Sequence, residues 1–356
     1  MMKKQRLSNR ELTQLISCTI LGISLALMAI IPTGFVIQRP GPTVNVLNED
    51  AGEPAISVAD AETYDPSGEL RLTTVQVHGG EGFPNWGFNV LGAYFRNDSS
   101  VMPVENVFPK DVTREEITER NQQEMEASQR RAVVVALEAL DYEVPTVLRI
   151  VGTVADSGAE GVLEDDDVLL GINGTRVSNF AELDDELSHI AGGKTVNVEI
   201  ERDGTETDVD VVTTASEDDA AQLGVLLDPD FDFPVEVDIN AHEIGGPSAG
   251  LIFSLGIVDL LTPGSLTGGE DIAGTGTIDL AGNVGPIGGI QQKLFGAADA
   301  GANWFLAPTN NCQDFSTVPD GLEVIPVDTF DSAKLAVDAI ASGQGSSLPT
   351  CDSVAD

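Results

Sequence analysis

The chain has 356 residues, of which 42% are hydrophobic, and its 58 acidic residues against 18 basic ones give a formal net charge of −40. This length and hydrophobic content exclude a wholly disordered chain and predict two or three domains. The charge disfavours nucleic-acid binding, because a strongly negative surface repels phosphate backbones. The acidity otherwise indicates solubility or adaptation to a salty exterior.

Residues 15–37, LISCTILGISLALMAIIPTGFVI, form an uncharged run near the N-terminus. About 20 apolar residues suffice for a helix to cross a bilayer. The basic residues before the run are Lys3, Lys4, Arg6 and Arg10. The positive-inside rule therefore predicts a cytoplasmic tail at 1–14 and places everything after about residue 38 outside the cell. Residues 26–29 look like a signal-peptidase site, but further apolar residues follow them, so we favour an uncleaved anchor.

Residues 38–143 are expected to form a membrane-proximal α+β region. Its first residues, 38–42 (QRPGP), predict a stiff, turn-rich exit from the membrane. Residues 69–78 alternate like a strand, whereas residues 81–103, rich in Gly, Asn, Pro and aromatic side chains, predict a loop.

The pattern of residues 113–140 predicts a long helix. Thr113 followed by Glu116 is the signature of a capping box, in which two otherwise unpaired backbone N–H groups are satisfied by side chains. A mostly apolar run forms the second half of this segment and ends near Asp141.

Residues 144–215 read in order as a strand, a Gly-rich turn, an acidic corner, a strand, an Asn-Gly turn, a helix and further strands. This order resembles a PDZ domain of the bacterial type. The resemblance is carried by Ser157-Gly158-Ala159, Gly161-Val162-Leu163, Asp167-Val168-Leu169 and Ile172-Asn173-Gly174. Such a domain binds an extended peptide at a sheet edge. No Gly-Leu-Gly-Phe-like loop precedes Val151, so no groove residues are assigned. The acidic run 164–167 is interpreted as a solvated turn, because it lacks the ligand spacing of a calcium loop.

The C-terminal third contains a serine in a Gly/Pro turn, residues 243–250 (EIGGPSAG). Pro247 suits the first position of a helix, and we expect that helix to run from Ser248 to Leu261. The serine would then lie beside unpaired backbone N–H groups at the positive end of the helix dipole. This position favours a reaction that generates an oxyanion.

A second motif, residues 275–293, reads TGTIDLAGNVGPIGGIQQK and ends on a lysine. A serine hydroxyl needs a base to become a good nucleophile. A lysine can be that base when burial lowers its pKa from about 10.4 to about 7–8. Lys293 is expected to start an apolar helix that ends at Gly301, which makes it a candidate desolvated base.

Together these motifs resemble the proteolytic domain of Lon peptidases, over roughly residues 230–341. The G-P-S-A-G turn and the stretch T-G-x-I-x-L-x-G-x-V-x-P-I-G-G-[IL]-x-x-K are both present without gaps. The resemblance implies that Ser248 is the nucleophile, that Lys293 is its general base and that Thr275 helps to orient the lysine. It also gives a supporting role to the neighbours of the serine: Gly246, Pro247 and Ala249.

The whole order resembles the PDZ-containing Lon-like peptidases of Gram-positive bacteria, with which residues 40–42, the LTTV stretch at 72–75 and Ser128-Gln129 also agree. The expected fold class is α+β multidomain, with an N-terminal transmembrane helix, a PDZ-like β-rich domain and a C-terminal Lon-type proteolytic α/β domain. The expected segments are a tail at 1–14, a transmembrane helix at 15–37, the membrane-proximal region at 38–143, the PDZ-like domain at 144–215, the proteolytic domain at 216–341 and a tail at 342–356.

The expected function is ATP-independent serine endopeptidase activity on exported or membrane-associated polypeptides. The sequence contains no G-x-x-x-x-G-K-[ST] motif, so no ATP is expected as a partner. No cofactor, metal or nucleic acid is expected either, since the histidines (His78, His189 and His242) lack metal-ligand spacing. A homo-oligomer is implied by the resemblance alone.

The sequence leaves alternatives for the catalytic base and for the function. His242 lies six residues before Ser248, so a Ser-His-Asp triad is an alternative to the Ser-Lys pair. The chain could instead be a non-enzymatic scaffold with a degenerate proteolytic domain, or an envelope protein that uses only its PDZ groove. We predict a disulfide between Cys312 and Cys351, the two cysteines of an exported region, while Cys18 lies in the apolar run.

Overall fold

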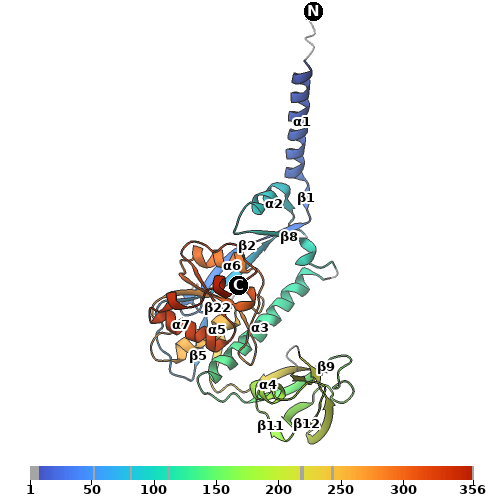
Figure 1. Cartoon of the computed structure of the whole chain (residues 1–356), viewed down its shortest axis with the longest axis vertical. Helices are drawn as coiled ribbons and strands as arrows, with labels where there is room; N and C mark the ends of the chain where they lie inside the picture. Colours follow the sequence, from blue (N-terminus) through green and yellow to red (C-terminus); the bar gives the residue numbers. More distant parts are fainter. Residues whose placement is uncertain are drawn as a thin grey trace, which may run out of the picture.

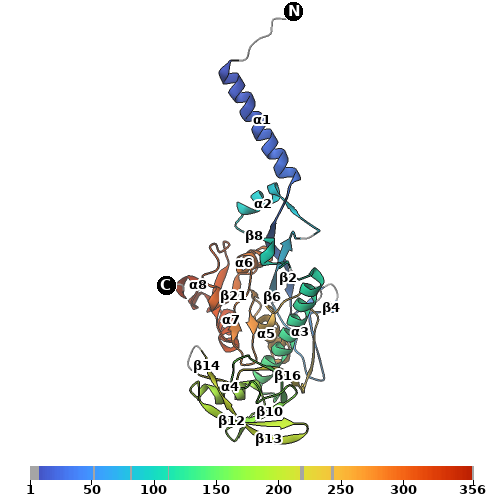
Figure 2. The same cartoon turned by 90° about the vertical axis from the view of Figure 1, so that its right-hand side faces the viewer.

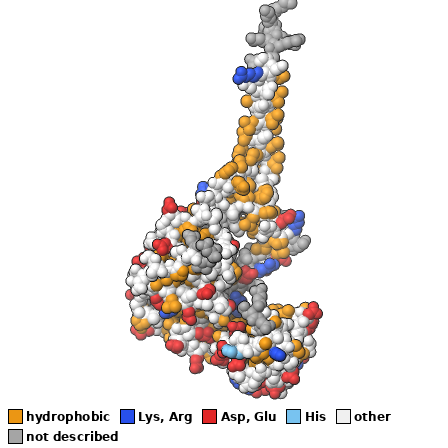
Figure 3. Space-filling view, in the orientation of Figure 1, with side chains coloured by type: hydrophobic (Ala, Val, Ile, Leu, Met, Phe, Trp, Pro, Cys, Tyr) orange, Lys and Arg blue, Asp and Glu red, His pale blue; other side chains and the backbone are white. Residues whose placement is uncertain are grey.

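The computed structural model describes residues 8–50, 53–80, 82–110, 112–216, 220–241 and 244–354. Its first helix, α1 (Asn9–Ile30), projects from one end of a central body, and a small β-rich lobe lies at the opposite end (Figures 1 and 2). Within α1, Leu12–Ile30 is long and apolar enough to cross a membrane, and none of it is buried against the rest of the protein. Apolar side chains cover α1, whereas acidic side chains are spread over the body and the lobe (Figure 3).

The helix ends earlier than predicted, so the expected span at residues 15–37 is corrected at its C-terminal end. Pro32 disfavours the helical conformation in the residue before it, and the chain turns into β1 (Pro32–Thr33). Strand β2 (Phe35–Asn45) follows and includes the predicted turn at 38–42. That turn prediction was wrong. The two prolines are accommodated by a shift of register between Pro40 and Thr43, where the ladder is irregular. The basic residues Lys3, Lys4 and Arg6 lie outside the described residues.

A six-stranded mixed sheet forms the centre of the body. In spatial order its strands are β22 (Glu323–Val327), β21 (Trp304–Pro308), β18 (Asp271–Gly274), β6 (Glu69–His78), β2 and β8 (Ser100–Pro103). The first four are mutually parallel, and β2 and β8 join antiparallel. The strand predicted at 69–78 is confirmed.

Helices cover both faces of this sheet. The helices of the body are α3 (Arg114–Glu138), α5 (Gly250–Leu261), α6 (Ile290–Asp299) and α7 (Phe330–Ala341). Because side chains alternate along a strand, neighbouring residues enter different cores. Ile272 packs with residues of α3, α5 and α7, whereas Ala273, the next residue, packs with residues of α6. The buried strands are therefore apolar on both sides, as in α/β proteins.

The central sheet contains strands from two of the predicted domains. Strand β6, from the expected membrane-proximal region 38–143, pairs with β18 from the proteolytic region, and β2 from the same region pairs with β6. Helix α3 packs against α5, and its capping box at Thr113 and Glu116 is confirmed. The proteolytic body is thus assembled from residues on both sides of the lobe in sequence.

The loop predicted at 81–103 was wrong, because this stretch contains β7 (Asn85–Trp86), α2 (Gly87–Tyr94) and β8. Contacts with the end of α1 and with β1 give this Gly-rich stretch regular structure that its composition does not favour. The remaining short elements of the body are β3 (Glu49–Asp50), β4 (Glu53–Pro54), β5 (Ile56–Ala59), β17 (Glu236–Ile239), β19 (Thr277–Ile278), β20 (Val284–Gly285), α8 (Cys351–Val354) and the 3-10 turns Val104–Asn106, Thr309–Asn311 and Gly345–Ser347.

The lobe is a second sheet with its own core. Its elements are β9 (Thr146–Thr153), β10 (Val168–Ile172), β11 (Thr175–Arg176), α4 (Phe180–Ser188), β12 (Thr195–Arg202), β13 (Thr205–Val212), β14 (Thr214–Ala215), β15 (Ala221–Gln222) and β16 (Val225–Phe231). Strand β16 lies beyond the predicted boundary at residue 215 but pairs with β9 along its length.

The acidic corner of the lobe is the expected turn, and Glu164, Asp165 and Asp166 are exposed, but Asp167 is not solvated. Asp167 is only 1% exposed, and Arg202 of β12 donates to both of its carboxylate oxygens, at 2.7 and 2.6 Å. Arg202 also donates to Glu164 at 2.7 Å. A buried carboxylate needs such a partner, so part of the acidic run fixes this corner to the sheet.

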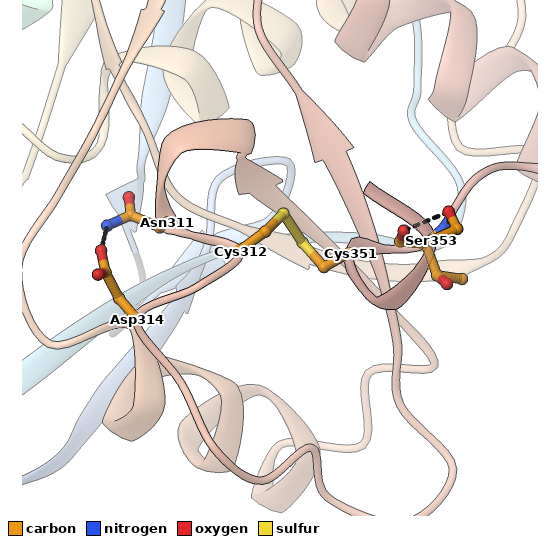
Figure 4. Close-up of a disulfide and its surroundings, with 6 residues drawn as sticks. Asn311, Cys312, Asp314, Cys351 and Ser353 are labelled. Atoms are coloured by element: carbon orange, nitrogen blue, oxygen red, sulfur yellow. Dashed lines mark hydrogen bonds between the residues drawn. A yellow bond between two sulfur atoms is a disulfide. The ribbon is translucent and has the colours of Figure 1, made fainter. Parts of the chain in front are cut away.

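A disulfide joins Cys312 to Cys351, with the Cα atoms 5.1 Å apart (Figure 4). Both cysteines are buried with residues of α6 and β21. The bridge ties the short α8 to the loop after β21, 39 residues earlier in the chain.

We expect the double substitution Cys312→Ala/Cys351→Ala to lower the free energy of unfolding by about 3 kcal/mol, because a cross-link over such a loop restricts the unfolded chain. Urea unfolding of the full chain in detergent micelles, followed by tryptophan fluorescence, measures the change. Cys18→Ala is the matched control and should unfold like the wild type. Equal stability of the double variant and the wild type would contradict the prediction.

Candidate active site

Ser248 lies in a turn just before α5, whose first residue is Gly250 and whose N-cap is Ala249. The helix therefore begins two residues after the expected start at Ser248, and it ends at Leu261 as predicted. The turn is held in place from outside the helix, and α3 supplies both contacts. Gly246, at a φ of +90°, donates its N–H to the carbonyl of Asn121 at 2.9 Å. The carbonyl of Pro247 accepts from the Ser128 hydroxyl at 2.9 Å.

The close approach of α3 to α5 also explains the glycine after the nucleophile turn. A Cβ at Gly250 would lie 2.8 Å from Ser128 Oγ and 2.9 Å from Ile278 Cγ2. Any larger residue would push the turn away from α3. Ser128 had no predicted role beyond its agreement with the family, and the structure shows that it anchors the serine turn.

Thr275 follows β18 directly and connects the sheet to the serine turn. Its hydroxyl donates to the carbonyl of Ser248 at 2.9 Å, and the N–H of Gly276 donates to the same carbonyl at 2.9 Å. A threonine hydroxyl has a single proton, and here that proton points toward the Ser248 carbonyl. Toward any other polar group, Thr275 can therefore only accept.

Lys293 is the fourth residue of α6 rather than the first, because the helix begins at Ile290 after Gly289, whose φ is +70°. Its amine lies 2.8 Å from Ser248 Oγ and 2.8 Å from Thr275 Oγ1. Since Thr275 can only accept, the amine donates to it. In the neutral form, this leaves the amine lone pair free to face the serine hydroxyl.

Burial sets the protonation of this lysine. The side chain is 2% exposed, and removal of the ammonium from water lowers the pKa of Lys293 to about 7. An amine with this pKa is substantially neutral near pH 7 and can accept the proton of Ser248.

A groove of about 630 Å³ leads to the pair. It is lined by Pro42, Thr43, Val44, Thr73, Thr74, Val75, Gln76, Ile244, Gly245, Ser248, Gly288 and Lys293, of which Lys293 is the single ionisable residue. Strand β18 pairs with β6 only as far as Leu72, so the next residues of β6 have a free edge on the side of β18. The stretches at 72–75 (LTTV) and 40–42 (Pro-Gly-Pro) had no predicted role, and both contribute residues to this groove.

The structure brings together Ser248, Lys293 and Thr275, with Gly246, Pro247 and Ala249 in the turn that holds the serine. The alternative base His242 lies outside the described residues. His78 ends β6 and His189 caps α4, and neither lines the groove. Cys312 and Cys351 lie in the core beneath α6 and contribute no group to the groove.

Family comparisons agree with this arrangement. The family model of the Lon protease (S16) C-terminal proteolytic domain matches residues 228–337, and that of the PDZ domain matches residues 124–213. The chain thus contains the proteolytic domain of a Lon-type serine peptidase together with a PDZ domain. With the apolar helix at its N-terminal end, it has the predicted fold class.

Curated relatives match through the proteolytic domain. A Lon protease of Azospirillum brasilense is 41% identical over 104 residues, which are 28% of this chain and 13% of the relative. A Lon protease of Rickettsia bellii is 36% identical over 118 residues, 32% of this chain and 15% of the relative. The chain therefore spans less than a sixth of the length of these relatives.

Among solved structures, the PDZ domain of an SdrC-like protein from Listeria innocua is 20% identical, covers 23% of this chain and 92% of that domain, and has a TM-score of 0.22. The corresponding domain from Listeria monocytogenes is 20% identical, covers 23% of this chain and 86% of that chain, and has a TM-score of 0.22.

We expect Lys293→Met to stabilise the protein, because methionine fills the site without a charge to desolvate. A pKa of about 7 instead of 10.5 means that the unfolded chain binds a proton that folded Lys293 does not, so wild-type stability rises with pH between these values. The variant should gain about 4 kcal/mol over the wild type at pH 7 and about 2 kcal/mol at pH 9.

Denaturant unfolding at both pH values measures this difference. Lys334→Met, on the exposed surface of α7, is the matched control and should show little change between the two pH values. A gain for Lys293→Met that does not shrink as the pH rises would contradict the lowered pKa.

Proposed function

We propose that this protein is a serine endopeptidase that uses Ser248 as nucleophile and Lys293 as general base. The observation that carries the proposal is the 2.8 Å contact between the buried Lys293 amine and Ser248 Oγ. The match to the Lon proteolytic domain supports it. The assembled pair argues against the scaffold alternative, since a degenerate domain has no reason to retain a costly buried lysine beside a serine.

In the proposed reaction, the neutral Lys293 takes the proton of Ser248 as Oγ attacks the carbonyl carbon of the scissile peptide bond. The oxyanion forms near the N-terminal end of α5, where backbone N–H groups and the helix dipole favour negative charge. The lysinium then gives its proton to the leaving amine. Water, deprotonated by the same lysine, hydrolyses the acyl-enzyme and releases Ser248.

The substrate is an extended segment of a polypeptide that lies along the free edge of β6. An added strand there would gain backbone hydrogen bonds and bring its carbonyls to Ser248. No acidic residue lines the groove among the residues that the structure describes, so charge selection by these walls is weak. The PDZ domain supplies a second peptide-binding module, which would select substrates or regulate their cleavage.

We further propose that cleavage needs no ATP. The part of the chain between α1 and the proteolytic residues is occupied by strands of the catalytic sheet, α3 and the PDZ lobe, and the sequence has no P-loop motif. Substrates would then be accessible or already unfolded segments. A homo-oligomer, implied by resemblance to Lon-type domains, stays a prediction.

The proposed location is a membrane that α1 crosses once, with the catalytic body outside the cytoplasm. The support is the apolar stretch Leu12–Ile30, the basic residues before it and the acidic body after it. The Cys312–Cys351 disulfide fits this orientation, because disulfides persist in oxidising compartments.

This orientation predicts that Cys312 and Cys351 are oxidised in living cells. Intact cells are treated with acid and a thiol-blocking reagent, and unreduced peptides of the protein are analysed by mass spectrometry. The linked peptide pair is expected, while Cys18 serves as an internal free thiol. Blocked, unlinked Cys312 and Cys351 would contradict the outward orientation.

The dyad is tested with the full chain in micelles and an unfolded protein substrate. Ser248→Ala and Lys293→Met should each lower kcat/KM by at least about a thousandfold, because the two residues act as one unit. The matched controls are Ser254→Ala, in the second turn of α5, and Lys334→Ala on α7. Both variants should cleave like the wild type. The wild type should be equally active with and without ATP.

The pH dependence follows from the same lysine. The rate should rise with pH through a limb centred near 7, because only neutral Lys293 accepts the serine proton. One pH unit below this midpoint, the rate should be about a tenth of its plateau value at high pH. His242→Ala should keep this profile. Loss of activity in His242→Ala, with Lys293→Met still active, would replace the proposed dyad with the histidine alternative.

A further inference from the structure

The most exposed apolar surface of the body lies on and around α2. It consists of large side chains that stay at least 41% exposed: Phe83, Trp86, Phe88, Leu91, Tyr94 and Phe95, which we call the aromatic patch. Phe83, Tyr94 and Phe95 keep 74%, 75% and 77% of their surfaces exposed. Contiguous apolar surface of this kind on a water-soluble body marks a contact site.

The charge of this stretch differs from that of the rest of the chain. Residues 82–95 contain no acidic or basic residue, in a protein whose net charge is −40. Basic side chains border the patch instead. Arg96 follows it directly, and Arg114 of α3 lies over the rings of Phe83 and Phe108, 5.7 and 4.7 Å from their centroids. Arg96 is paired with Asp98, which leaves Arg114 as the basic group over the rings. An uncharged aromatic stretch with an arginine over its rings suits contact with lipid headgroups and acyl chains.

The position of the patch identifies its partner. Strand β7 pairs with β1, so Trp86 lies opposite Pro32, two residues after the end of the apolar helix. Gly87, the first residue of α2, approaches Met28 so closely that a Cβ there would lie 3.1 Å from the Met28 carbonyl oxygen. The apolar surface of α1 thus continues onto the body at the level where the helix leaves the bilayer (Figure 3).

We infer that the aromatic patch lies in the interfacial layer of the same bilayer that α1 crosses. The inference rests on the membrane anchoring proposed above. Tryptophan and tyrosine favour this layer because their rings are apolar and their polar atoms reach water. The patch gives the body a second membrane contact, so that the body is oriented on the bilayer rather than free to turn about a single helix.

The test uses the full chain reconstituted in phosphatidylcholine vesicles, either plain or with brominated acyl chains, which quench nearby indoles. The protein has two tryptophans, so the wild-type spectrum minus that of Trp86→Phe gives the emission of Trp86. For the far end of the patch, Phe95→Trp is added to Trp86→Phe, and the Trp86→Phe spectrum is again subtracted. The spectrum of Trp86→Phe itself reports Trp304 in the catalytic sheet and is the matched control.

Brominated lipid is expected to lower the emission of both patch indoles about twofold or more, while aqueous iodide quenches them little at every protein-to-lipid ratio. Trp304 should respond equally in the two kinds of vesicle. If the chain floats with the vesicles but the indoles at positions 86 and 95 are insensitive to brominated lipid, the inference is wrong and the anchoring stands. If they are instead shielded from iodide only at high protein-to-lipid ratios, a second copy covers the patch and the inference is also wrong. Failure to float would overturn the anchoring itself.

Discussion

The neutral state of Lys293 is the constraint on which the rest of the site depends. A lysine in water is protonated near pH 7 and cannot take a proton from serine. Here the surrounding core excludes water, and within the described part of the chain no acidic side chain shifts the pKa of Lys293 back up. The site must therefore hold together without ion pairs. It does so through neutral hydrogen bonds, chiefly those that Thr275 makes with Lys293 and with the Ser248 carbonyl. The packing of the surrounding core offsets the free-energy cost of removing the amine from water.

Helix α3 connects the three functional parts of the molecule. It is 25 residues long, and a helix of that length spans about 37 Å. Its first residue, Arg114, lies at the aromatic patch, and its middle holds the serine turn through Asn121 and Ser128. Its C-terminal end leads into the PDZ lobe. If a peptide bound in the lobe moved α3, the two hydrogen bonds from α3 would therefore transmit that movement to the serine turn. The sheet of the lobe would not have to change.

The sequence was most informative where chemistry restricts the residue types. The contiguous stretch from Thr275 to Lys293, through its resemblance to Lon-type domains, predicted that Thr275 and Lys293 lie beside Ser248, and the structure places them in contact. The capping box at Thr113 and the strand at 69–78 were likewise predictable from local pattern.

The missed features depend on contacts between distant segments, which no local pattern reports. Strand β2 keeps two prolines only because β6 and β8 flank it, and α2 forms only beside α1. Asp167 looks solvated in the sequence, since its partner Arg202 is 35 positions away. The role of Ser128 depends on a turn 119 residues further along the chain.

Strand β2 also has a consequence for which bonds the protein can cut. It begins at Phe35, beside the end of the membrane helix, and its far part lines the groove at Pro42 to Val44. At about 3.3 Å per residue, this rigid strand separates the groove from the bilayer surface by about 25 Å. The length of β2 would thus set the distance from the membrane at which cleavage occurs. In the membrane-anchored arrangement proposed above, a substrate tethered to the same membrane would have to present its scissile bond on a stalk of about that height.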